Sequence, residues 1–295
     1  MANLKDIRKR ISSVKSTQKI TRAMKMVAGA RLNRAQQRIT ALRPYAVMTA
    51  ETMMDVVAVQ YAHGRMDTSH PLLARRDKKN VLLLVITSDR GLCGSFNANI
   101  NKRAEAVWRE TEAQGIGVQI ATIGRKGRDY FKRRNAPIFH VFDGVWDDLG
   151  MHQTRIIAHK LLRPFVTGEV DAVEIVYNEF KSAMTQTVSY GPLFPLPISE
   201  EAERSALEMG DPIFEPDKDT LLKRLVPRYV EITLLRALYE SMASELGARM
   251  TAMDAATNNA SEMIADLTLQ YNRLRQAAIT TEILEIIGGA EALNQ

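Results

Sequence analysis

The sequence predicts an α/β protein with a long antiparallel coiled coil, in which one helix from each end of the chain flanks a central α/β domain. At both ends, apolar residues recur at about every 3.5 positions, the period of a coiled coil. In the middle, strand-like and helix-like segments alternate. The 295 residues are enough for about two structural units. Only 6% of them are aromatic, which disfavours a turn-rich all-β fold.

The N-terminal coiled-coil helix is predicted over residues 1–60. Steps of three and four residues lead from Leu4 to Val56 through positions that are mostly apolar or small. At 1.5 Å per residue this stretch is about 80 Å long, more than the diameter of a compact domain, so the helix must leave the globule. Pro44 is the only helix breaker within it and predicts a kink.

The C-terminal coiled-coil helix is predicted over residues 217–290. The same stepping leads from Ile232 to Leu284, and Gly288 and Gly289 predict the helix stop. The two stepped stretches are equally long, which predicts one intramolecular coiled coil. With a compact domain between the helices, the pair must be antiparallel, with both chain ends together at the far tip.

Polar residues interrupt the predicted seam of this coiled coil. They are Gln18, Thr21, Lys25, Arg249, Gln270 and Thr281. Polar seam residues can specify the register of two helices, at a cost in stability. They can equally be contacts to a third surface that changes along the helices, and the sequence favours neither interpretation.

The middle of the chain, residues 78–195, predicts a Rossmann-like α/β domain. The predicted strands are Val81–Thr87, Val118–Ile123, Ile138–Phe142, Ala172–Tyr177 and Thr187–Tyr190, with helices near 97–113, 125–134 and 151–166. Such alternation indicates a sheet that is parallel at first and antiparallel at its end. Residues 196–216 are predicted to be a connector, because they are rich in proline and hold an acidic cluster at Glu200–Glu203.

The charge is distributed unevenly along the chain. Residues 1–45 hold twelve Lys or Arg and one acid, Asp6, a balance of +11, so the other 250 residues sum to −5 within the net charge of +6. This basic arm predicts an anionic partner. Tyr45 is its only aromatic residue, which favours an acidic protein surface over a nucleic acid. The longest uncharged apolar run, Val81–Ser88, is too short to span a bilayer, and no signal peptide is predicted.

A glycine-containing turn follows the first predicted strand. Strand, glycine-rich turn and helix N-terminus together form the general geometry of a phosphate site, but the spacing matches neither a Walker loop nor a dinucleotide fingerprint. We expect a tight turn in which glycine supplies a positive φ, and a buried thiol at Cys93. The histidines that could activate Cys93 are His63, His70, His140, His152 and His159, and none has a catalytic setting. The sequence predicts no catalytic residue, metal site or cofactor.

Three motifs resemble the γ subunit of F-type ATP synthase, of the bacterial type. The first comprises Ile7–Ile11 and Thr17–Ala28. The second is the turn Ser88, Asp89, Arg90, Gly91, Leu92, Cys93 and Gly94. The third runs over Arg249–Ala260 and continues through Tyr271–Arg273 and Arg275–Thr280 to Glu282–Ile286. The motifs occur in the family's order over nearly the full length.

The resemblance implies a non-catalytic rotor shaft. In this family the coiled coil stands inside a hexamer of three alpha and three beta subunits. The α/β domain lies beside the epsilon subunit and the membrane ring of c subunits, and proton flow turns one copy of the shaft per complex. Because no transit peptide precedes Leu4, the expected location is peripheral, on the cytoplasmic face of a bacterial inner membrane. The paired-cysteine insert of chloroplast relatives is absent.

The resemblance also implies which residues contact the hexamer. On the first helix they are Ile20, Thr21, Arg22, Met24 and Lys25, and on the second they are Arg249, Arg275, Gln276, Thr280 and Glu285. Two other functions remain as alternatives: a structural coiled-coil protein that binds nucleic acid through its basic arm, and an α/β enzyme that binds a nucleotide at the Gly91–Gly94 turn.

Overall fold

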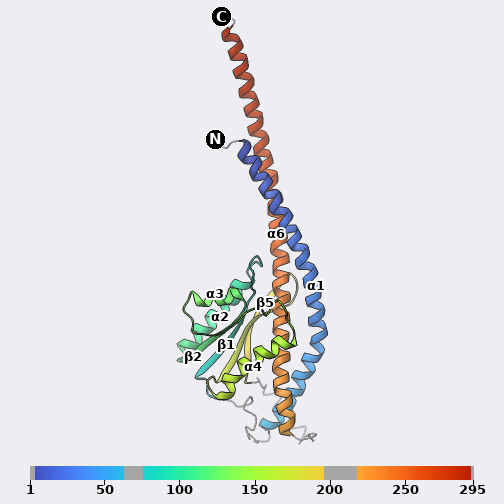
Figure 1. The fold of residues 1–295 in the computed structure, drawn as a ribbon, viewed down its shortest axis with the longest axis vertical. Helices are drawn as coiled ribbons and strands as arrows, with labels where there is room; N and C mark the ends of the chain where they lie inside the picture. Colours follow the sequence, from blue (N-terminus) through green and yellow to red (C-terminus); the bar gives the residue numbers. More distant parts are fainter. Residues whose placement is uncertain (1–3, 63–75, 196–217, 294–295) are drawn as a thin grey trace. The chain divides into compact units, whose positions relative to one another are not determined.

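The computed structural model describes residues 4–62, 76–195 and 218–293 (Figure 1). The chain forms two compact units. The coiled-coil unit comprises Met1–Gly29 and Arg249–Gln295, and the α/β unit comprises Ala30–Ala248. The predicted connector at 196–216, like His63 and His70, lies outside the described residues.

The α/β unit contains the predicted sheet. Its strands are β1 (Asn80–Ile86), β2 (Gly117–Ile123), β3 (Ile138–Phe142), β4 (Ala172–Phe180) and β5 (Gln186–Phe194), in the order β3-β2-β1-β4-β5. The first four strands are parallel, and β5 pairs with β4 in the antiparallel direction, as predicted.

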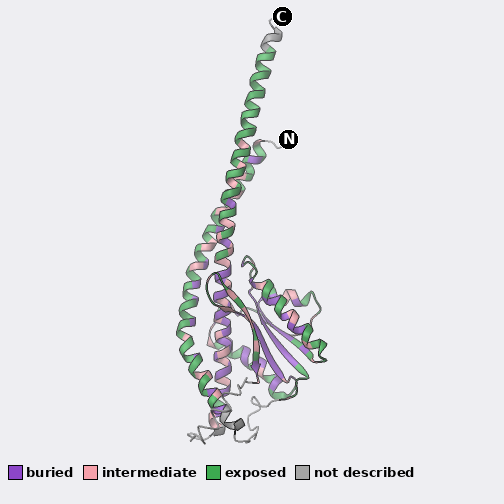
Figure 2. Ribbon diagram, turned by 180° about the vertical axis from the view of Figure 1, so that it is seen from behind, coloured by how far each residue is buried: buried purple, intermediate pink, exposed green. Residues whose placement is uncertain are grey.

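Helices cover both faces of the sheet, which explains why β1 is a continuous apolar run. Leu83 and Val85 of β1 pack with α2 (Phe96–Ala113) and α3 (Arg125–Lys132). Leu82 and Leu84 point to the other face, toward α4 (Met151–Thr167) and buried residues of the two long helices. The central strands β1 and β4 are buried along most of their length, as the buried colour of the strands in Figure 2 shows.

The two long helices are α1 (Leu4–Ala62) and α6 (Lys218–Leu293). Every position on the predicted seam of α1, from Leu4 to Val56, is buried or half-buried, and α1 continues through Pro44. The predicted stop at Gly288 and Gly289 is wrong, because α6 passes through both glycines without a left-handed residue. Glycine permits a left-handed cap but does not require one, and in a helix each costs only about 1 kcal/mol relative to alanine.

The helices also differ in length, with 59 residues in α1 and 76 in α6. Near the start of α1, the Arg8 guanidinium donates a hydrogen bond to the Tyr271 hydroxyl. The prediction that both chain ends lie together is therefore wrong: α6 continues well past the end of α1 (Figure 1). Residues 272–289 of α6 are all exposed (Figure 2). Within the described ranges, no helix combines the length and apolar character needed to cross a membrane.

Glycine is required where β2 turns into α3. Gly124 has φ +91°, and a Cβ there would lie 2.2 Å from the Thr87 carbonyl oxygen.

We expect Gly124→Ala to lower the free energy of unfolding by about 2–4 kcal/mol, because the clash adds to the strain of a positive φ. Gly144→Ala is the matched control, since Gly144 has φ +72° but open space around it. It should cost only about 1 kcal/mol. Denaturant unfolding of both variants measures the difference, and equal losses would contradict the close approach.

Candidate functional site

The motif turn Ser88–Gly94 follows β1 at the carboxyl end of the parallel strands and is held by Asn97 of α2. The Ser88 amide donates to Asn97 Oδ1 at 3.0 Å, and Asn97 Nδ2 donates to Ser88 Oγ at 2.9 Å and to Cys93 Sγ at 3.2 Å. Two turn residues have a positive φ, Leu92 at 63° and Gly94 at 55°. The expected glycine requirement is therefore confirmed at Gly94, whereas the second left-handed position is Leu92 and not Gly91.

The amides that would bind a phosphate at the start of α3 are already used by the protein. The Arg125 amide donates to Asp89 Oδ1 at 2.9 Å, the Lys126 amide to the Ser88 carbonyl at 3.1 Å, and the Gly127 amide to Thr87 Oγ1 at 2.8 Å. A helix N-terminus binds an anion through open amides. Here the Asp89 carboxylate occupies the position that the anion would take, so this end of α3 offers no nucleotide site.

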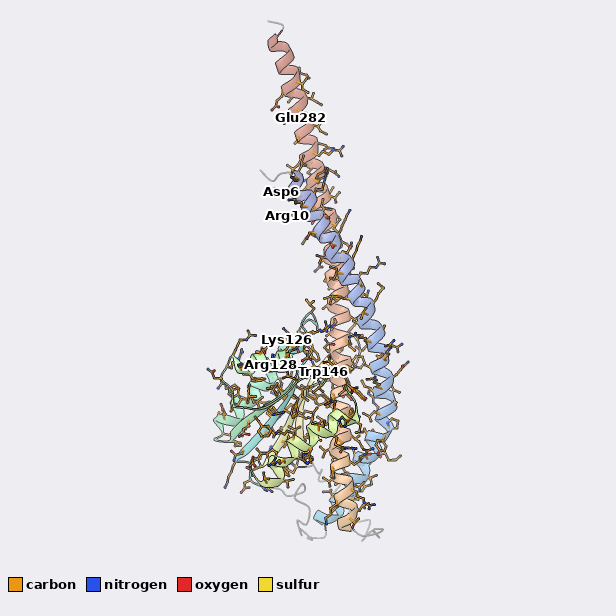
Figure 3. All side chains as sticks on the ribbon, viewed as in Figure 1. Asp6, Arg10, Lys126, Arg128, Trp146 and Glu282 are labelled. Atoms are coloured by element: carbon orange, nitrogen blue, oxygen red, sulfur yellow. The ribbon has the colours of Figure 1, made fainter. Side chains whose placement is uncertain are left out.

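On the same edge of the sheet, the Trp146 indole donates to the Thr87 carbonyl at 3.0 Å. Figure 3 labels Trp146 and Lys126 near this end of the strands. In doubly wound sheets, ligands bind outside the carboxyl ends of the strands. The side chains of Asp89 and Trp146, together with the Thr87 hydroxyl, instead tie these loops to one another.

Cys93 is buried, with 2% of its surface exposed, as expected for a structural thiol. It packs in the apolar cluster between the sheet and helices α2 and α3. His152 and His159 are exposed on α4, which covers the opposite face. Burial, with the Lys160 charge adding to it, lowers the pKa of His140 on β3, so this imidazole is neutral near pH 7. No group of three or more His, Cys, Asp or Glu in the described segments is placed to hold a metal ion.

The predicted contact residues of α1 fall into two groups. Ile20 (57% exposed) and Arg22 face outward, and Met24 is half-buried. Thr21 is only 8% exposed and shares a hydrogen bond of 2.8 Å with Thr257 on α6. Lys25 is half-buried and forms an ion pair with Asp254, with 2.6 Å between Nζ and Oδ1. Thr21 and Lys25 are thus occupied within the coiled coil.

The predicted contact residues of α6 lie mostly beyond the end of α1. Arg275, Gln276, Thr280 and Glu285 are all exposed, and Arg249 is half-buried. The same stretch exposes apolar residues that the resemblance does not name as contacts. They are Leu274, Ile279, Ile283, Leu284, Ile286 and Ile287. The predicted seam with α1 includes Leu274 and Leu284, but both are exposed in the structure.

The polar seam residues were predicted either to specify the helix register or to contact a third surface, and their bonding partners bear on this choice. Gln18 donates to Ser261 Oγ at 2.7 Å, so Gln18, Thr21 and Lys25 all bond across to α6. This supports a role in the helix register for these three residues. Gln270 and Thr281 are exposed.

The basic arm keeps its charge at the surface. Of the twelve Lys and Arg in residues 1–45, eleven are exposed and Lys25 alone is half-buried. Arg10 and Asp6 are labelled on this part of α1 in Figure 3. The exposed positive charge is available to an acidic surface.

The hydrogen bonds of Asn97 predict how the motif turn responds to mutation. Asn97→Ala would remove the acceptor of the Ser88 amide and the group bonded to Cys93, at a cost of about 1–3 kcal/mol. In folded Asn97→Ala protein, we expect the Cys93 thiol to react with a thiol reagent several-fold faster than it does in the parent protein. The control is Asn99→Ala on the same helix, because the Asn99 side chain bonds only the exposed Ser95 hydroxyl among its described contacts. Equal labelling rates in both variants would contradict this account of the turn.

Comparison with known proteins identifies the family. A family model described as ATP synthase matches residues 3–293. The ATP synthase gamma chain of Sorangium cellulosum is 55% identical to this chain, and the match covers 100% of both chains. The ATP synthase gamma chain of Anaeromyxobacter sp. is 49% identical, and the match covers 99% of this chain and 100% of the relative. The fold is similar to that of a chain in the Euglena gracilis mitochondrial ATP synthase, with a TM-score of 0.65 at 21% identity over 98% of this chain and 94% of that one. The chain therefore belongs to the ATP synthase gamma chain family.

Proposed function

We propose that this chain is the central rotor shaft of a proton-translocating ATP synthase. Its rotation would couple proton flow through a membrane ring to ATP synthesis or hydrolysis in a hexamer of alternating alpha and beta subunits. Membership of the gamma chain family over residues 3–293 supports this function. The same evidence does not support the alternative of a nucleic-acid-binding coiled-coil protein.

The observation that carries the proposal is the exposed end of α6. Residues 272–289 are an exposed part of a single helix, and Ile279, Ile283 and Ile286 are 42%, 50% and 71% exposed. Isolated helices are marginal in water, and contiguous exposed apolar surface marks an interaction site. A cavity that encloses this segment from several sides would stabilise it, and we propose that the alpha and beta subunits form that cavity.

The charge of α1 suits the same partner. Eleven exposed cations on residues 1–45 need an acidic surface nearby, and polar contacts can be exchanged during rotation more readily than a tightly packed apolar interface. We propose that the outward-facing Ile20 and Arg22, together with the half-buried Met24, contact the hexamer. On α6 the proposed contacts are Arg249, Arg275, Gln276, Thr280 and Glu285.

The chain itself is proposed to be non-catalytic and peripheral. Support for the first point comes from the start of α3, whose first amides are satisfied by Asp89, Ser88 and Thr87. One copy per complex would act at the cytoplasmic face of the bacterial inner membrane. The α/β unit would be in contact with the epsilon subunit and the c-subunit ring.

Purification of the complex through a tag on this chain tests the proposal. We expect one copy of the chain with three alpha and three beta subunits, and loss of ATP-driven proton pumping when the chain is omitted from reconstitution. Recovery as a homo-oligomer with bound nucleic acid would favour the alternative function instead.

The contact residues on α6 are tested by a matched pair of arginines. We expect Arg275→Ala to weaken binding of the chain to the alpha–beta hexamer about ten-fold, because arginine is frequent among the residues that dominate interface energetics. Arg273→Ala, which removes the same side chain two residues away, should change affinity less than two-fold. Affinity is measured by titrating labelled chain with hexamer. The assignment fails if Arg273→Ala weakens binding as much as Arg275→Ala.

A further inference from the structure

We infer that four polar pairs between α1 and α6 set the axial register of the coiled coil. These pairs, here called the polar ladder, are Arg8–Tyr271, Gln18–Ser261, Thr21–Thr257 and Lys25–Asp254. The inference concerns the chain itself and does not depend on the proposed function. It assigns Thr21 and Lys25 to an internal role.

The geometry of the ladder is regular. The four contacts are 2.7, 2.7, 2.8 and 2.6 Å long between the bonded atoms. The two residue numbers of each pair sum to 278 or 279, so numbers fall along α6 almost as fast as they rise along α1, which is the pattern of one continuous antiparallel register. Gln18, Thr21 and Lys25 are three and four residues apart, so they follow the same face of α1 as the buried Ala28.

The apolar seam cannot select this register by itself. On α1 it consists of Ile7, Ile11 and Val14 before the polar stretch, and on α6 the buried residues opposite that stretch are Met253 and Ala260. Because such a seam repeats every heptad, sliding one helix by seven residues again places apolar or small residues against each other. Small side chains such as Ala260 interlock weakly, so little apolar packing would be lost.

The polar ladder opposes that slide. Counted along α6, a slide of one heptad would place Lys25 opposite Ser261 or Gly247 and never opposite a carboxylate. The Thr21 hydroxyl would then no longer face the Thr257 hydroxyl. Polar and charged seam positions specify register in coiled coils because mismatched partners leave half-buried groups unsatisfied. The ladder therefore fixes how far the C-terminal part of α6 projects beyond Leu4 of α1.

Disulfide trapping measures this register in the full-length chain. The hydroxyl oxygens of Thr21 and Thr257 are 2.8 Å apart, so cysteines at both positions can bring their sulfurs to bonding distance. The background is Cys93→Ser with Thr21→Cys and Thr257→Cys. Oxidised glutathione takes up the two electrons of the new bond, and the rate of intramolecular disulfide formation is the readout.

Charge reversal then tests the ladder. Lys25→Glu should slow trapping about three- to five-fold, the scale expected for a partly exposed ion pair replaced by a repulsive one. Adding Asp254→Lys should restore the rate, because the pair is re-formed with its charges exchanged. Lys19→Glu is the matched control: it reverses the same charge on the exposed side of α1 and should leave the rate unchanged.

A second measurement covers variants in which the introduced cysteines form a disulfide slowly for reasons other than a changed helix register. Spin labels at the exposed positions Lys15 and Glu262, in Cys93→Ser protein, report the distance between the helices by pulsed electron paramagnetic resonance. We expect one narrow distance in the parent and in the charge-exchanged variant, and a broad or shifted distribution in Lys25→Glu alone. No rescue by Asp254→Lys in either measurement, or an equal effect of Lys19→Glu, would overturn the inference.

Discussion

The burial of one stripe of α6 is the constraint on which the rest of the structure depends. Val226, Val230, Leu234 and Leu238, spaced at four residues, are fully buried in the core that α6 shares with α1, α4 and the sheet. Each such side chain stabilises the fold by about 1.5–3 kcal/mol. The helix that is held so firmly in this core continues without a break into the coiled-coil unit. A single helix thus belongs to both units.

The packing along that helix changes in kind from one unit to the other. In the α/β unit, the buried side chains of α6 are mostly apolar and pack with α1, α4 and the sheet. In the coiled-coil unit it is covered on one side only, by α1, and the seam turns small and polar between Gln18 and Lys25. Specificity there comes from paired hydrogen bonds and one ion pair. Residues 272–289 of α6 are exposed, and their apolar side chains form the surface for which a partner is proposed.

The α/β unit has a doubly wound, mostly parallel sheet, yet the start of its helix α3 is closed to a ligand by side chains and a carbonyl of the protein. Asp89, Thr87 and Ser88 accept the first amides of α3, and Trp146 bonds to the Thr87 carbonyl. Fold likeness alone does not establish function. In this chain the same strand–turn–helix geometry stabilises a rigid turn that exposes Leu92 and holds Cys93 inside.

The sequence alone determined the elements, the buried face of α1 and the buried face of α6 as far as Ala260. Steps of three and four placed every seam residue of α1 correctly, and the apolar run at Val81–Thr87 identified the central strand, because periodicity is a local property of the chain. The motif turn was also found in the sequence, whereas the contact residues are a prediction from the family resemblance. Only the tertiary structure decided which residues pair across the seam, including the buried contact of Thr21 with Thr257. It also decided that α6 extends beyond the N-terminal end of α1. These features depend on contacts between residues more than two hundred positions apart, and no local pattern encodes which of several equivalent heptads will face each other.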